Sequence, residues 1–162
     1  MYASHPMSIL LLQVREPTTA EHDFACFVES FGIPAESIVR RSAYDPLPED
    51  LHAYRAIIMG GSHEDVSAFA SLLEPPQWFS ALPAFVRRVH ATDIPFLGIC
   101  FGMQLAAHAL GGTVIRDDTR AEYGTYTITQ TTDGANDPIL ARLPSTFLMQ
   151  EGHHDHVTVL PP

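Results

Sequence analysis

Short apolar runs alternate along the chain with longer segments in which apolar residues recur at helical spacing. Residues 8–14 form a continuous apolar run typical of a strand buried on both faces, and further strands are predicted at 36–44, 54–61 and 94–99. Helical spacing follows at 18–32, 75–93 and 101–110, and Gly32 and Gly111 are typical stops. Pro83 lies inside the second helical segment, where we expect it to interrupt or restart the helix.

Strands that alternate with helices predict parallel β-α-β units with right-handed crossovers. The expected fold is therefore α/β: a doubly wound, mostly parallel sheet of the flavodoxin-like, three-layer kind. After Thr113 the pattern changes to β-rich runs at 112–117, 122–132, 147–152 and 156–160, which predict a small antiparallel addition to the sheet. We expect one domain over residues 1–162 that lacks its C-terminal part, because the chain stops at Pro162 directly after a strand.

The formal net charge of −10 argues against a nucleic-acid or anionic membrane surface, since both need clustered Lys and Arg. Two cysteines, Cys26 and Cys100, make no disulfide framework, which favours a reducing compartment. The apolar run Ile9–Leu12 is too short for a membrane span and lacks the basic lead of a signal peptide. These features predict a cytoplasmic protein with no nucleic-acid or membrane partner.

One cysteine stands at the junction between a predicted strand and a predicted helix. Cys100 is flanked by Gly98 and Gly102, which is the G-x-C-x-G spacing of a nucleophile elbow. Small flanking residues are needed because a tight turn brings neighbouring backbone close. The start of the helix favours the thiolate, and the N–H of Phe101 offers a first oxyanion donor. We therefore predict a reactive role for Cys100, whereas Cys26, within a helical segment, is interpreted as an ordinary packed residue.

Other polar positions fit the same chemistry. Gln104 lies four residues after Cys100 and so shares its helix face. The loop after 54–61 begins with two glycines whose N–H groups could complete an oxyanion site. A thiol nucleophile needs an imidazole base, and the stretch "HHDH" at 153–156 supplies three histidines and one carboxylate.

Four blocks in order, "IIMGGS", "GICFGMQ", "EYGTYTI" and "HHDHVTVLP", resemble the motifs of the class I (triad) glutamine amidotransferases. The resemblance runs from about Ala56 to the end of the chain. It implies a cysteine enzyme, with transferase and hydrolase chemistry, that hydrolyses the side-chain amide of L-glutamine through a thioester. It also implies ammonia transfer to a separate synthetase subunit. The enzyme that the resemblance implies uses no cofactor and no metal.

Carried over to this chain, the resemblance makes Cys100 the nucleophile and His153 the base, with His154 as the alternative base. It assigns the oxyanion hole to the N–H groups of Gly61 and Phe101. Gln104, Tyr123 and Gly124 are then expected to contact glutamine. The list of predicted site residues is Cys100, His153, Gly61, Phe101, Gln104, Tyr123 and Gly124.

The family's third triad member, a glutamate in an H-P-E block, has no counterpart in these residues, and neither Glu122 nor Glu151 matches its position. The sequence leaves three alternatives open. The domain could be a non-catalytic binding or regulatory module on the same fold, since fold does not fix function. It could be a cysteine hydrolase of γ-glutamyl peptides. The HHDH stretch could also hold a metal ion, although alternate residues of a strand point to opposite faces.

Overall fold

The computed structural model describes residues 8–162. The chain divides into two compact units. The larger, which we call the sheet unit, runs up to Arg116 and resumes at Asp155–Pro162. The smaller, the hairpin unit, is Asp117–His154.

A four-stranded parallel sheet forms the centre of the sheet unit, with strand order β2-β1-β3-β4. The strands are β1 Ile9–Gln13, β2 Ile38–Ser42, β3 Ala56–Met59 and β4 Phe96–Gly98. All four predicted strands are thus confirmed. The middle of β1 has no solvent exposure because it lies between two strands and is covered on both faces.

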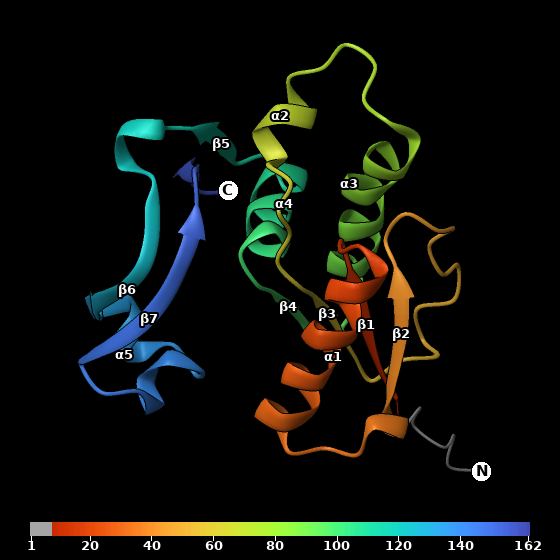
Figure 1. The fold of residues 1–162 in the computed structure, drawn as a ribbon, viewed down its shortest axis with the longest axis horizontal. Coiled ribbons are helices and arrows are strands. Elements are labelled where there is room, and N and C mark those ends of the chain that lie inside the picture. Colours follow the sequence, from red (N-terminus) through yellow and green to blue (C-terminus); the bar gives the residue numbers. More distant parts are fainter. Residues whose placement is uncertain (1–7) are drawn as a thin grey trace. The chain divides into compact units, whose positions relative to one another are not determined.

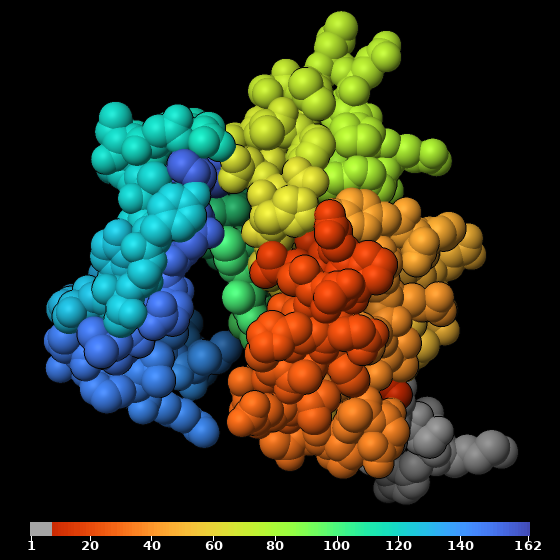
Figure 2. Space-filling model, viewed as in Figure 1, coloured from red at the N-terminus to blue at the C-terminus, as the bar shows by residue number. Residues whose placement is uncertain are grey.

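Helices cover both faces of this sheet (Figure 1). Helix α1, Pro17–Phe31, packs Phe24 and Phe27 against Leu11 and Ile58, and it forms the orange-red surface in Figure 2. The helices α3, Gln77–His90, and α4, Phe101–Ala109, bury their apolar side chains against the opposite face. The predicted three-layer, doubly wound arrangement is confirmed. Cys26, in contrast, is exposed on α1 rather than packed.

Helix α3 continues through Pro83, so the expectation of an interruption there is wrong. A proline in a helix interior lacks the N–H that would bond to the carbonyl four residues earlier. The cost is offset by the helix's apolar face, where Leu82, Phe85 and Val89 are almost fully buried against the sheet.

The β-rich part after Thr113 forms antiparallel pairs, as predicted. In the sheet unit, β5 Thr113–Arg116 pairs with β8 Asp155–Val159. In the hairpin unit, β6 Glu122–Thr129 pairs with β7 Thr146–His153. Within residues 8–162 neither pair is hydrogen-bonded to the central sheet, so the expected addition to that sheet takes the form of two separate two-stranded sheets.

Five short helices, none of which the sequence predicted, complete the structure. Two are α-helical, α2 Val66–Ala70 and α5 Thr132–Asn136, and three are 3₁₀ turns at Ala35–Ser37, Asp118–Arg120 and Leu140–Arg142. Over the described part of the chain, no helix has the length and apolar character that a membrane crossing requires. The single, C-terminally incomplete domain over 1–162 stays a prediction.

Candidate active site

The sharp turn predicted between strand and helix is present at Cys100. This residue lies between β4 and α4 with φ 51° and ψ −107°, and it alone among the described non-glycine residues has a positive φ. Such a conformation is strained for a residue with a Cβ and persists only where the surroundings impose it. The turn therefore has the geometry of a nucleophile elbow.

Close backbone contacts explain the two glycines of the elbow. A Cβ on Gly98 would lie 2.6 Å from the carbonyl carbon of Gly102, and a Cβ on Gly102 would lie 2.3 Å from the carbonyl oxygen of Met59. Both separations are well below van der Waals contact. The tight approach of β4, α4 and β3 thus requires glycine at both positions, as the G-x-C-x-G spacing predicted.

Two predicted oxyanion donors belong to residues beside Cys100. Phe101 begins α4, so its N–H has no acceptor inside that helix. Gly61 follows β3, and a Cβ built on it would lie 3.5 Å from the Cβ of Cys100. The loop after Gly61 is held by Ser62, whose hydroxyl donates to the carbonyl of Val14 at 2.9 Å and accepts from the N–H of Glu64 at 3.0 Å.

Gln104 is buried one turn into α4, where its N–H donates to the carbonyl of Cys100 at 3.0 Å. Its side-chain Nε2 donates to the backbone carbonyl of Asp155 at 3.0 Å. The amide therefore joins the elbow helix to β8. Substrate contact by Gln104 stays a prediction.

Asp155 is a structural residue that the sequence reasoning did not identify. Its carboxylate is 2% exposed and accepts two hydrogen bonds from Ser67, one from the N–H at 2.8 Å and one from the hydroxyl at 2.5 Å. Ser67 lies in the first turn of α2, and the side chain of the N-cap residue, Asp65, makes no capping hydrogen bond. Asp155 thus caps α2 from β8. In the sequence this residue is the one carboxylate of the HHDH stretch, and its bond to Ser67 has no local signal.

His153 ends β7 in the hairpin unit, opposite Glu122 of β6. Its Nε2 lies 3.3 Å from an oxygen of Glu122 and 3.3 Å from an oxygen of Glu151. The imidazole is mostly buried, with 19% of its surface exposed. Glu122 and Glu151 thus both lie beside the His153 imidazole. Neither of them matches the position of the family's triad glutamate in the sequence.

His154 has contacts through both ring nitrogens. Nε2 pairs with the hydroxyl of Tyr123, and Nδ1 lies 2.7 Å from a carboxylate oxygen of Asp118. Tyr123 is 63% exposed, and Gly124 beside it has φ 117°, a conformation that favours glycine. Between Ser8 and Pro162, no group of three or more His, Cys, Asp or Glu side chains gathers around a possible metal position.

A family model described as "Glutamine amidotransferase class-I" matches residues 29–162, which is most of the chain. The chain belongs to this family. The resemblance given by the four sequence motifs is thereby confirmed. The match includes Cys100, both oxyanion candidates and the HHDH stretch, so every predicted site residue of this class I amidotransferase lies inside it.

Curated relatives of this class I amidotransferase include GMP synthases named as glutamine-hydrolyzing. The one from Thermomicrobium roseum is 42% identical over 95 residues, which are 57% of this chain and 16% of the relative. The one from Thermus thermophilus is 35% identical over 118 residues, 72% of this chain and 20% of the relative. The chain thus spans a fifth or less of the length of these two relatives.

Solved structures support the same fold. A glutamine amidotransferase from Methylobacillus flagellatus superimposes with a TM-score of 0.71 at 23% identity, covering 96% of this chain and 58% of that one. A glutamine amidotransferase from Thermotoga maritima gives a TM-score of 0.73 at 18% identity, covering 96% of this chain and 64% of that one. At these identities the likeness bears on the fold alone.

Proposed function

We propose that this chain hydrolyses the side-chain amide of L-glutamine through Cys100 and supplies ammonia to a separate synthetase. The observation that carries the proposal is the strained elbow at Cys100, at the start of α4, in a chain of the class I amidotransferase family. The named activity of the GMP synthase relatives, glutamine hydrolysis, supports the choice of substrate.

In the proposed reaction, the thiolate of Cys100 attacks the amide carbon of glutamine and forms a carbon–sulfur bond. The carbonyl oxygen becomes an oxyanion, for which the N–H groups of Gly61 and Phe101 are the candidate donors. When the carbon–nitrogen bond breaks, a proton from a general acid lets the nitrogen leave as ammonia. Water then attacks the thioester, releasing glutamate and restoring the thiol.

For the acid–base group, His153 is the candidate within the chain. A base needs a ring nitrogen for the proton that it takes. The histidine-x-aspartate spacing of the class I motif places the base two residues before Asp155, which favours His153 over His154. The two carboxylates at Nε2 of His153 would stabilise the imidazolium that forms.

Labelling with an electrophilic glutamine analogue, followed by intact mass measurement, tests the nucleophile. We expect one adduct that excess glutamine suppresses, that Cys100→Ser abolishes and that Cys26→Ser leaves intact. Cys26 is the matched control because it is the exposed second cysteine, on α1. If folded protein takes up no adduct, the non-catalytic binding module becomes the better description of the chain.

Ammonia release from glutamine tests the base separately. We expect His153→Asn to lower the rate at least about a hundredfold, in the range for loss of a general acid–base group, while His154→Asn has a smaller effect. An unchanged rate in His153→Asn would assign the base to another group. Faster turnover of γ-glutamyl peptides than of glutamine would favour the hydrolase alternative.

A further inference from the structure

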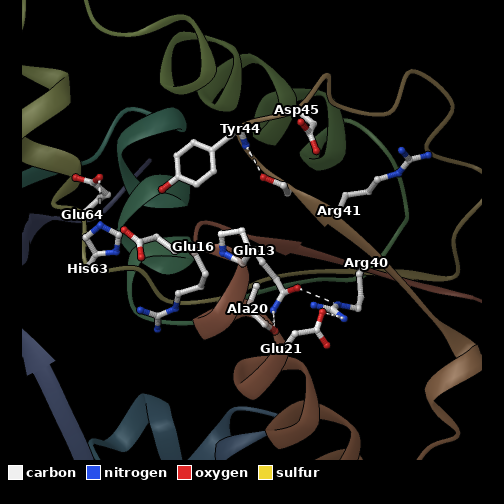
Figure 3. Close-up of a pocket in the computed structure, with 13 residues that line it drawn as sticks. Gln13, Glu16, Ala20, Glu21, Arg40, Arg41, Tyr44, Asp45, His63 and Glu64 are labelled. Carbon is white, nitrogen blue, oxygen red and sulfur yellow. Dashed lines mark hydrogen bonds and ion pairs between the residues drawn. The ribbon is translucent and has the colours of Figure 1, made fainter.

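A cavity in the sheet unit is lined by residues other than Cys100. It has a volume of about 780 Å³ and opens at the carboxyl ends of β1 and β2, with the loop after β3 on its far side (Figure 3). In this sheet the strand order reverses between β1 and β3, and the loop after β3 supplies His63 and Glu64 to the cavity. Crevices at such switch points are the preferred ligand sites of open α/β sheets.

One wall of the cavity has its polar groups already paired. The side chain of Gln13 donates to the carbonyl of Ala20 and to Asp23, both at 2.9 Å, and accepts from Arg40 at 3.3 Å. Arg40 also donates to Glu21 at 2.8 Å. This wall is therefore a fixed scaffold, whose hydrogen bonds are among the dashed lines in Figure 3.

The opposite end of the cavity contains a buried guanidinium nitrogen without a hydrogen-bond partner in the described part of the chain. Nε of Arg15 is buried and makes no hydrogen bond among the described residues. A buried guanidinium N–H without an acceptor is unfavourable, and an anionic group in the cavity would satisfy it. Glu16 follows at the N-cap of α1 and makes no capping bond, so its carboxylate is available to a ligand.

The phenol of Tyr44 lies among the charged groups at this end of the cavity. Figure 3 shows its phenol reaching toward Glu16, with Glu64 and His63 beyond it. Burial raises the pKa of the phenol above its ordinary value, the carboxylates of Glu64 and Glu16 raise it further, and Arg15 lowers it. The positive charge of Arg15 and the negative charges of Glu16 and Glu64 therefore all lie close enough to affect Tyr44.

The charge pattern decides which chemical class fits. Four carboxylates and three guanidinium groups line the cavity, so a phosphate dianion would face several like charges. A zwitterion meets both signs, with its carboxylate near Arg15 and its ammonium near Glu16 and Glu64. We propose that this cavity binds a small zwitterion, a free amino acid or a dipeptide, held between Arg15 and the carboxylates of Glu16 and Glu64.

The site differs from the glutamine site proposed above, because among the described residues neither Cys100 nor Phe101 lines the cavity. The two sites are nevertheless neighbours. A Cβ on Gly61 would lie 3.2 Å from Nη2 of Arg15 on one side and 3.5 Å from Cys100 on the other. The ligand proposal stands on the cavity alone and does not require glutamine hydrolysis.

Amide chemical shifts of ¹⁵N-labelled Cys100→Ser protein measure the binding without turnover. The probes are the free L-amino acids, L-alanyl-L-alanine, the N-acetylated and amidated forms of the tightest binder, and inorganic phosphate. The variants are Arg15→Gln and Glu16→Gln. Glu29→Gln, an exposed carboxylate on the same helix outside the cavity, is the matched control.

We expect shifts at Arg15, Glu16 and Tyr44, and about tenfold weaker binding in Arg15→Gln and Glu16→Gln, as for loss of one charged contact. The control should bind as the parent does. Three results would overturn the proposal: no binding to about 10 mM, binding that survives both cavity variants, or capped forms or phosphate binding as tightly as the zwitterion. Because Cys100 is absent from this test, its failure would leave the glutaminase proposal untouched.

Discussion

At Gly102 the elbow helix approaches the backbone of the central sheet closely. Alanine is normally favoured over glycine inside a helix by about 1 kcal/mol. Here a Cβ would lie 2.3 Å from the carbonyl oxygen of Met59, a backbone atom that cannot yield without moving β3. We therefore predict that Gly102→Ala lowers the free energy of unfolding by about 2–4 kcal/mol, measured by urea denaturation.

Gly152→Ala is the control for that substitution. A Cβ at Gly152 meets no atom within 4 Å, and its φ lies outside the left-handed region. Its stability should match the parent or exceed it slightly, because alanine loses less conformational entropy on folding. Equal effects of the two substitutions would mean that the close approach at Gly102 does not exist.

Asp117 is a second single residue with a testable consequence, namely that the stability of the folded state depends on pH through its carboxylate. The carboxylate of Asp117 accepts a hydrogen bond from the hydroxyl of Thr119 at 2.6 Å and another from Nε of Arg120 at 2.7 Å. These bonds lower the pKa of Asp117 to about 2, and the bond from Thr119 contributes most. A carboxyl pKa lowered in the folded state stabilises that state above the unfolded pKa near 4. This contribution is lost as the pH falls from about 4 to about 2.

An NMR titration of the Asp117 carboxyl carbon should show a midpoint of about 2. In Thr119→Ala the midpoint should rise toward 3.8, since the largest cause of the shift is removed. A midpoint near 3.8 in the parent protein would contradict the hydrogen-bond network of the turn at Asp118–Arg120.

Helix α3 allows a prediction at the scale of an element. Pro83 stands in its interior, where a proline loses one backbone hydrogen bond, whereas Pro17 is the first residue of α1, where no bond is lost. We predict that Pro83→Ala raises the free energy of unfolding by about 1–2 kcal/mol. Pro17→Ala should leave it unchanged or lower it slightly. Calorimetric melting of both variants distinguishes the positions, and destabilisation by Pro83→Ala would mean that packing of the ring outweighs the missing bond.

The elements that the sequence predicted are those with a local signal. Four short strand-like runs became the four central strands. The glycine spacing around Cys100 predicted the elbow because G-x-C-x-G is a local motif, although the atom that requires glycine at position 102 belongs to Met59 of β3. The continuity of α3 through Pro83 could not be predicted from local preference, since burial against the sheet outweighs it. The separate pairing of β5 with β8 depends on a contact across about forty residues, which no local pattern specifies.

The candidate site likewise contains residues that a local motif predicted and residues whose contacts depend on the tertiary structure. Cys100 and Phe101 follow from a motif, and Gly61 from a neighbouring strand end. The contact between Asp155 and Ser67 joins residues 88 positions apart, and the approach of Glu122 to His153 depends on the register of β6 and β7. Buried carboxylates find their partners through tertiary structure, so a single sequence shows the charged residue but not what it bonds to.

At the scale of the whole molecule, the two units differ in how their strands are supported. Leu10, Leu11 and Leu12 of β1 have no exposure, whereas none of the residues 117–154 is fully buried. Two-stranded hairpins without a buried face are at best marginally stable. We therefore predict that the β6–β7 hairpin opens locally, without unfolding of the central sheet.

Hydrogen exchange followed by NMR checks this prediction. Amides of the hairpin, such as that of Tyr126, should exchange at least about a hundredfold faster than the amide of Leu11, allowing for intrinsic rates. Leu12→Ala should speed exchange in β1, because a core truncation of about 2–5 kcal/mol lowers the global free energy of unfolding. The same substitution should leave exchange in the hairpin unchanged, because local opening does not depend on global stability. Equal acceleration in β1 and the hairpin would instead require both units to open in one cooperative transition.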